Sequence, residues 1–152
     1  MMVQRLSWFS IFINVPVYFH SEYPKFDLKP KLKYKKWLSD VIHSENKSTG
    51  NINFIFVSDE ELFEINNKYL QHDTYTDIIT FDYSEDKKVS ADIFISIDRV
   101  RENSIKYATT AELELNRVMV HGVLHLLDYN DITNQEKTQM RKMEEKYLSL
   151  LD

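Results

Sequence analysis

The spacing of apolar residues along the chain predicts four strands. Apolar and polar residues alternate over residues 10–15, which is the pattern of a half-buried strand. Three further runs are rich in β-branched and aromatic residues, which also indicates strands. They cover residues 52–57, 76–83 and 91–97, with polar turns expected at 46–50 and 84–88.

Helical spacing of apolar residues predicts two longer helices. Residues 30–44 carry an apolar stripe at helical intervals, and Pro30 suits the first turn of such a helix. A second helical stretch covers residues 110–127, with a shorter helix expected from residue 98 before it.

Two further helices are predicted from their start signals. Ser58 is followed three positions later by Glu61, and Thr133 by Glu136 in the same way, which is the pattern of a capping box. The helices that begin there are expected to bury one apolar face each. The inward-facing residues are Leu62, Ile65 and Tyr69 in the first, and Met140, Met143 and Tyr147 in the second.

The order of these elements indicates one α/β (α+β) domain over residues 1–152, with about four strands. Strands and helices interleave, and no linker separates them. Residues 1–9 are expected to form a frayed N-terminal extension. The apolar segment 6–19 is interrupted by Ser, Asn and Pro and is too short to cross a bilayer. We therefore expect a cytoplasmic protein with no membrane segment.

Composition limits the chemistry that the chain can perform. The 152 residues include no Cys, which excludes disulfides, thiolate metal sites, iron–sulfur clusters and a cysteine nucleophile. Any metal must therefore be held by imidazole and carboxylate groups. The formal net charge of −5 does not favour nucleic-acid binding, but such binding needs only a local basic face. The lysine-rich stretch 25–36 could provide one.

Two histidines in the predicted helix 110–127 form a candidate metal site. His121 and His125 are four positions apart, so their side chains lie one turn apart on the same helix face. A catalytic zinc site commonly has three protein ligands, and Asp131 could supply the third if the chain turns back near Asp128. Asp tolerates the left-handed conformation that such a turn needs. The alternative is that both histidines are ordinary helix residues and that Asp131 is a turn residue.

The residue after the first histidine bears on the reaction. Zinc proteases with the H-E-x-x-H motif place a Glu general base there, whereas this chain has Gly122. Peptide hydrolysis by that mechanism is therefore disfavoured. Cleavage of a phosphodiester depends less on such a Glu, because a metal ion can itself generate the nucleophile and stabilise charge.

Three blocks of sequence resemble the YbeY family of bacterial metallo-endoribonucleases. The family motif H-G-x-L-H-L-x-G-Y-D-H corresponds to residues 121–131, which read HGVLHLLDYND. The block T-D-V-L-S-F corresponds to residues 76–81, TDIITF, and the block G-D-I before a strand corresponds to residues 91–93, ADI. The three blocks occur in the family's order.

The resemblance implies a fold, an activity and a set of site residues. The fold is a small mixed sheet flanked by helices, related to zinc metalloproteases. The activity is metal-dependent cleavage of single-stranded RNA, in 16S rRNA 3′-end maturation and ribosome quality control, with single-stranded rRNA and the small ribosomal subunit as partners. The family holds one Zn²⁺ with three histidines. His121 and His125 match two of them, and Asp131 stands at the third position, with Fe or Mn left open as the metal.

The family's phosphate-binding Arg does not carry over, because Leu70 occupies its position. Candidate substitutes are His72, Lys68 and Arg117. Lys31, Lys33 and Lys35 are further candidates for the RNA contact through the basic stretch. Two alternatives to the endoribonuclease remain: a non-catalytic ribosome-assembly factor with a structural metal, and a metal-dependent hydrolase of another bond.

Overall fold

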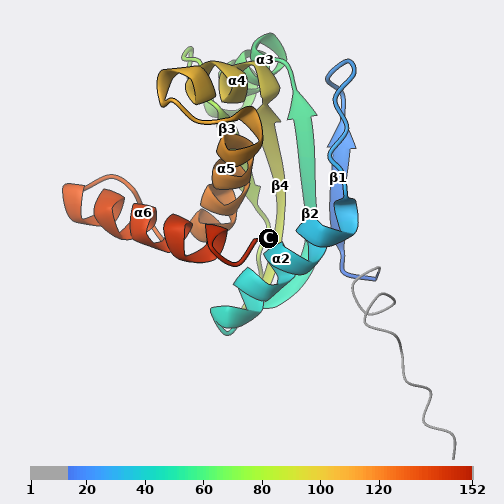
Figure 1. Ribbon diagram of the computed structural model, residues 1–152, viewed down its shortest axis with the longest axis vertical. Coiled ribbons are helices and arrows are strands. Elements are labelled where there is room, and N and C mark those ends of the chain that lie inside the picture. Colours follow the sequence, from blue (N-terminus) through green and yellow to red (C-terminus); the bar gives the residue numbers. More distant parts are fainter. Residues whose placement is uncertain (1–13, 152) are drawn as a thin grey trace, which may run out of the picture.

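The computed structural model describes residues 14–151, which form four strands and five helices (Figure 1). The elements in chain order are β1 (Val17–Ser21), α2 (Lys31–Ser44), β2 (Ser48–Val57), α3 (Asp59–Leu70), β3 (Ile78–Asp82), β4 (Lys88–Ser96), α4 (Ile97–Lys106), α5 (Ala111–Leu126) and α6 (Asn134–Leu148).

The four strands form one mixed sheet in the order β1-β2-β4-β3. Strands β1, β2 and β4 are parallel to one another, and β3 pairs antiparallel with β4 at the edge. This sheet with its flanking helices confirms the predicted fold class. Within residues 14–151, no helix combines the length and apolar character needed to cross a bilayer.

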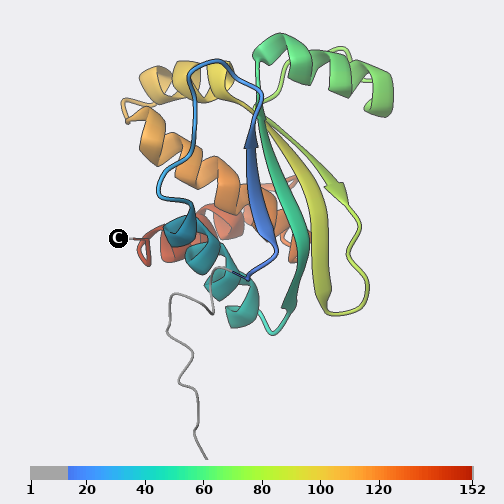
Figure 2. The same cartoon turned by 90° about the vertical axis from the view of Figure 1, so that its right-hand side faces the viewer.

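The main hydrophobic core lies between the sheet and the helices on one of its faces. Helices α2 and α5 pack on this face, as Figure 2 shows from the side. Alternate residues of the central strands point into the core, among them Phe54 and Phe56 of β2 and Ile93 and Ile95 of β4. A smaller cluster lies under α3 on the opposite face, where Leu62 packs with Val57 and Ile79.

Both predicted helix starts are confirmed. The Thr133 side chain accepts from the backbone N–H of Glu136, and the Glu136 carboxylate accepts from the backbone N–H of Thr133, which completes the capping box. The Ser58 hydroxyl accepts from the backbone N–H of Glu61, which is one half of the capping box predicted there. The predicted inward face of α6 is also confirmed, because Met140, Met143 and Tyr147 are buried.

Several predicted boundaries are wrong, and each has a local cause. Of the strand expected at 10–15, residues 10–13 lie outside the described part, and the chain turns at 14–16 before β1 begins at Val17. The extension expected at 1–9 also lies outside the described residues. The turn expected at 46–50 ends early, because Ser48 and Thr49 already pair with β4, and an irregularity in register follows them.

The buried face predicted for α3 is too long. Tyr69 is 60% exposed, because α3 covers only one end of the sheet and its last turn extends past the cluster formed by Leu62. The Tyr69 ring instead packs edge-on against the ring of Phe81 in β3, with the ring centroids 6.0 Å apart. Pro30 precedes α2 as its N-cap and does not lie in its first turn.

Candidate metal centre

Helix α5 presents the two motif histidines side by side. The Thr110 hydroxyl caps the helix by accepting from the backbone N–H of Leu113, and the opposite face of α5 is fixed in the core. His121 and His125 lie on the partly exposed face one turn apart, and their Nε2 atoms are 3.0 Å apart. Two imidazole nitrogens thus converge at one point.

The chain reverses directly after α5 and returns to the same point. Asp128 has a φ of 72°, a left-handed conformation that Asp tolerates. Its carboxylate also pairs with Lys47 at 3.1 Å. The reversal places Oδ2 of Asp131 3.4 Å from Nε2 of His121 and 3.5 Å from Nε2 of His125.

These three atoms have the spacing of ligands around one cation. Zinc binds imidazole nitrogen and carboxylate oxygen at about 2.0–2.2 Å, so two tetrahedral ligands stand about 3.3–3.5 Å apart. The two separations to Asp131, 3.4 and 3.5 Å, fall in this range, and the 3.0 Å between the two Nε2 atoms is slightly shorter, so a small shift of one imidazole would let the three atoms hold one small divalent cation. The side chains are 18%, 33% and 40% exposed for His121, His125 and Asp131, so the site is open on the Asp131 side.

A fourth residue, Glu144, fixes the orientation of His121. Its Oε2 lies 2.7 Å from Nδ1 of His121, so the carboxylate accepts from the Nδ1–H and leaves Nε2 unprotonated for a cation. The sequence analysis missed Glu144. A signal was available, because Glu144 lies next to Met143 on the face of α6 that was predicted to be buried, where a charged residue requires a partner.

Arg117 connects Glu144 to two more carboxylates. Its Nη1 donates to Oε1 of Glu144 at 3.3 Å, and its Nη2 donates to Oε1 of Glu114 at 2.6 Å. The carboxylate of Asp77 lies 3.9 Å from Nη2. Burial lowers the pKa of the Arg117 guanidinium, but the hydrogen bonds and charge of Glu114 outweigh it and leave the pKa raised. Burial raises the pKa of Asp77, and Arg117 opposes this.

Gly122 lies where α5 approaches the sheet most closely. A Cβ on Gly122 would stand 2.8 Å from Cδ1 of Ile78 and 3.5 Å from Cγ2 of Ile93. Any larger side chain would therefore meet the sheet. At the position where the protease motif has its Glu, this chain has Gly122, which lets the helix pack closely against the sheet.

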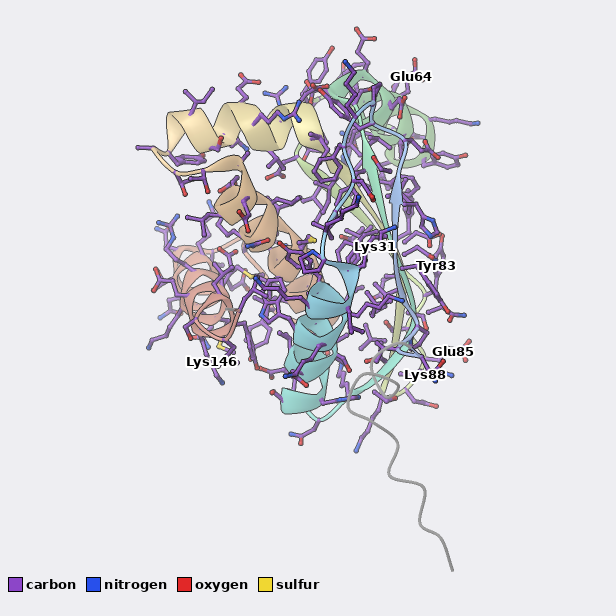
Figure 3. The ribbon with its side chains drawn as sticks, turned by 45° about the vertical axis from the view of Figure 1, so that its right-hand side comes forward. Lys31, Glu64, Tyr83, Glu85, Lys88 and Lys146 are labelled. Atoms are coloured by element: carbon purple, nitrogen blue, oxygen red, sulfur yellow. The ribbon has the colours of Figure 1, made fainter. Side chains whose placement is uncertain are left out.

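The candidate RNA contacts are spread over other elements. His72 is exposed after α3, and its backbone N–H donates to the Asn66 carbonyl. Lys31, Lys33 and Lys35 lie in the first turns of α2, and Figure 3 shows Lys31 at the start of this helix. Glu45, the residue after α2, accepts from the Tyr129 hydroxyl at 3.1 Å. The opposite end of α2 therefore adjoins the motif, about 15–21 Å along the helix from the lysines.

A comparison with family models assigns the chain. The model described as Endoribonuclease YbeY matches residues 19–152. The chain belongs to this family. Proteins named Endoribonuclease YbeY include relatives from Flavobacterium psychrophilum, 49% identical over 125 residues, and from Cytophaga hutchinsonii, 45% identical over 135 residues. These alignments cover 82% and 88% of this chain, and 89% and 94% of the relatives.

The YbeY assignment agrees with a solved structure. The solution structure of a protein from Thermotoga maritima has a TM-score of 0.62 and 25% sequence identity to this chain, covering 89% of this chain and 88% of that one. The match covers most of both chains, so this YbeY chain has the same overall fold as that protein.

Proposed function

We propose that this protein is a metal-dependent endoribonuclease specific for single-stranded RNA, with His121, His125 and Asp131 as its metal ligands and Zn²⁺ as its metal. The observation that carries the proposal is the triangle of ligand atoms, with sides of 3.0, 3.4 and 3.5 Å, in a YbeY chain. Its proposed role is 16S rRNA 3′-end maturation and ribosome quality control on the small subunit, in the cytoplasm.

The donor set agrees with a catalytic role better than with a structural one. Catalytic metal sites typically use three protein ligands, whereas structural sites are closed by four. Among the described residues, the one group of His, Asp and Glu with metal-ligand spacing has three members, all partly exposed. The exposure of Asp131 and His125 leaves a side from which an RNA strand can approach.

Each residue has a defined part in the proposed site. A bound divalent cation would act as a Lewis acid toward the phosphodiester. His121 and His125 would each present Nε2 to it, and Asp131 would present Oδ2. Glu144 holds the proton on Nδ1 of His121, and the turn at Asp128 sets the position of Asp131.

The RNA contacts are assigned to basic side chains on other elements of the surface. His72, Lys31, Lys33 and Lys35 would contact phosphates, whereas Arg117, the other candidate from the sequence, donates to Glu114 and Glu144. Lys31 pairs only loosely with Asp27, at 3.6 Å, and both side chains are about half exposed, so RNA could replace this contact.

Metal analysis combined with a cleavage assay tests the proposal. Protein purified without added metal should hold about one equivalent of zinc, as expected for a single site. It should cleave single-stranded RNA and spare the same sequence as a duplex, and a chelator should stop cleavage. The double variant His121→Ala, His125→Ala should lose both metal and activity. Bound metal without cleavage would favour the assembly factor and overturn the enzymatic role, and iron or manganese in place of zinc would overturn the choice of metal.

A further inference from the structure

Arg117 and His121 lie on the same face of α5, one turn apart, and both contact Glu144 of α6. Figure 1 shows α6 packed against α5. The Oε1 atom of Glu144 accepts from Nη1 of Arg117 at 3.3 Å, and Oε2 is 2.7 Å from Nδ1 of His121. Each oxygen of this buried carboxylate thus has a different partner.

This division fixes the rotation of the Glu144 carboxylate. A carboxylate is planar, so turning it about its last bond moves both oxygens together. The contact with Arg117 therefore selects the orientation in which Oε2 points at His121. Without this contact, the carboxylate could turn while remaining near the imidazole.

Arg117 is itself held in place by a second carboxylate. Its Nε and Nη2 atoms both donate to Glu114, at 3.1 Å to Oε2 and 2.6 Å to Oε1, which is a forked pairing within one turn of α5. Glu114 is only 3% exposed. The guanidinium therefore has a defined position, from which Nη1 reaches Glu144.

We propose that Arg117 is a positioning residue for the metal centre, which acts through Glu144 to hold the Nδ1–H form of His121 and so direct Nε2 at the cation. The expected effect on metal binding rests on the proposed metal site. Which nitrogen of His121 carries the proton can be measured without metal. Arg117 thus has an internal role, because its N–H groups face carboxylates of the protein itself.

Imidazole nitrogen NMR of the metal-free protein tests the orientation directly. In a neutral imidazole ring the two nitrogen shifts report which nitrogen carries the proton, so the spectra are recorded at alkaline pH, where a further rise in pH leaves the shifts unchanged. His121 should be protonated on Nδ1 in the wild type. The variant Arg117→Met, Glu114→Gln should show a mixture of both forms. The double variant removes one positive and one negative charge, so the net charge is that of the wild type and no unpaired carboxylate is left buried at position 114. The single variant Glu114→Gln is its reference.

Metal affinity in a double-mutant cycle tests the route through Glu144. Replacing Arg117 on the Glu114→Gln background should weaken zinc binding about tenfold, at the lower end of the range for residues that support metal ligands. On a background that also carries Glu144→Gln, the same replacement should have no further effect. Arg117→Lys should restore only part of the affinity, because an ammonium lacks the forked geometry. Arg141→Met, an exposed change on α6, should leave zinc affinity unchanged.

The outcomes separate this inference from the proposed function. If His121 keeps the Nδ1–H form without Arg117, or if the two effects on affinity simply add, Arg117 is not a positioning residue. If the wild type binds no metal, the proposed centre fails, and the nitrogen shifts of His121 still decide the role of Arg117.

Discussion

Glu144 and His121 are 23 positions apart in the chain, and a contact of 2.7 Å joins Oε2 of the one to Nδ1 of the other. The contact joins the last helix to the helix that carries the metal motif. Because it determines which nitrogen of His121 faces the candidate site, we expect the position of α6 to affect metal binding.

Glu144→Gln should weaken metal binding without removing it. A neutral amide is a poorer acceptor for the Nδ1–H than a carboxylate, and loss of such a support typically costs about 10–100-fold in metal affinity. Competition with a chromophoric chelator would measure the change. Glu145→Gln is the matched control, because Glu145 is the exposed neighbour of Glu144 on α6. Equal affinities for the two variants would contradict the supporting role.

Asp131→His should change the preference of the site among metals. Carboxylate oxygen suits manganese, whereas imidazole suits zinc, so the ratio of zinc to manganese affinity should rise in the variant. Titrations with each metal would give the ratio. Asp128→His makes the same change in the same turn, where Asp128 pairs with Lys47, and should leave the ratio as it is. An unchanged ratio in Asp131→His with metal still bound would show that Asp131 is a turn residue only.

Charge reversal of Lys31, Lys33 and Lys35 should weaken the binding of single-stranded RNA. Each lost phosphate contact removes about 0.7 from the slope of log affinity against log salt for a single strand, so the salt dependence should become flatter. Reversal of Lys137, Lys142 and Lys146 changes the net charge equally on α6, where Figure 3 shows Lys146 well away from Lys31. The same change of slope in both triple variants would indicate a general charge effect and no specific contact on α2.

Gly122→Leu should destabilise the fold by about 1–3 kcal/mol, the usual cost of forcing a larger side chain into a packed core. The added side chain would meet Ile78 and Ile93, because a Cβ alone already stands 2.8 Å from Cδ1 of Ile78. Urea unfolding would measure the loss. Gly122→Ala should cost less, because the nearest atom is the end of a flexible side chain and Ala favours the helix. Equal stability of the Leu variant and the wild type would show that α5 can move from the sheet freely.

Tyr147→Phe should reduce the loss of stability at alkaline pH. Burial, and then the hydrogen bond to Glu45, raises the pKa of the Tyr147 phenol. In the unfolded chain the phenol ionises near pH 10, so its contribution is complete below pH 10 and is lost as the pH rises toward the folded-state pKa. From pH 9 to pH 11 the wild type should lose about 1 kcal/mol more than the variant.

Urea unfolding at pH 9 and pH 11 would compare the two proteins. Tyr83→Phe is the control, because Tyr83 is 58% exposed, and it should follow the wild type. If Tyr147→Phe loses as much stability as the wild type over this range, the phenol is not the group that titrates.

The sequence by itself determined the features that depend on neighbouring residues. Capping signals at Ser58 and Thr133 located the starts of α3 and α6, because a cap is made within one turn of the helix. The four-residue spacing of His121 and His125 placed their side chains on one face, because helix geometry alone fixes this relation. The sequence also allowed a left-handed turn at Asp128, because Asp tolerates that conformation, and the structure has one there.

Only the tertiary structure decided which distant groups meet. The contacts of Glu144 with His121 and Arg117 depend on the angle and register at which α6 packs on α5, and no local pattern encodes these. The exposure of Tyr69 has the same origin, because its helical spacing is that of a buried residue, whereas the placement of α3 on the sheet gives its ring an edge-on contact with Phe81 and leaves it 60% exposed. Local geometry repeats along a chain and can be read from it, whereas packing between separate elements depends on the shapes of all of them together.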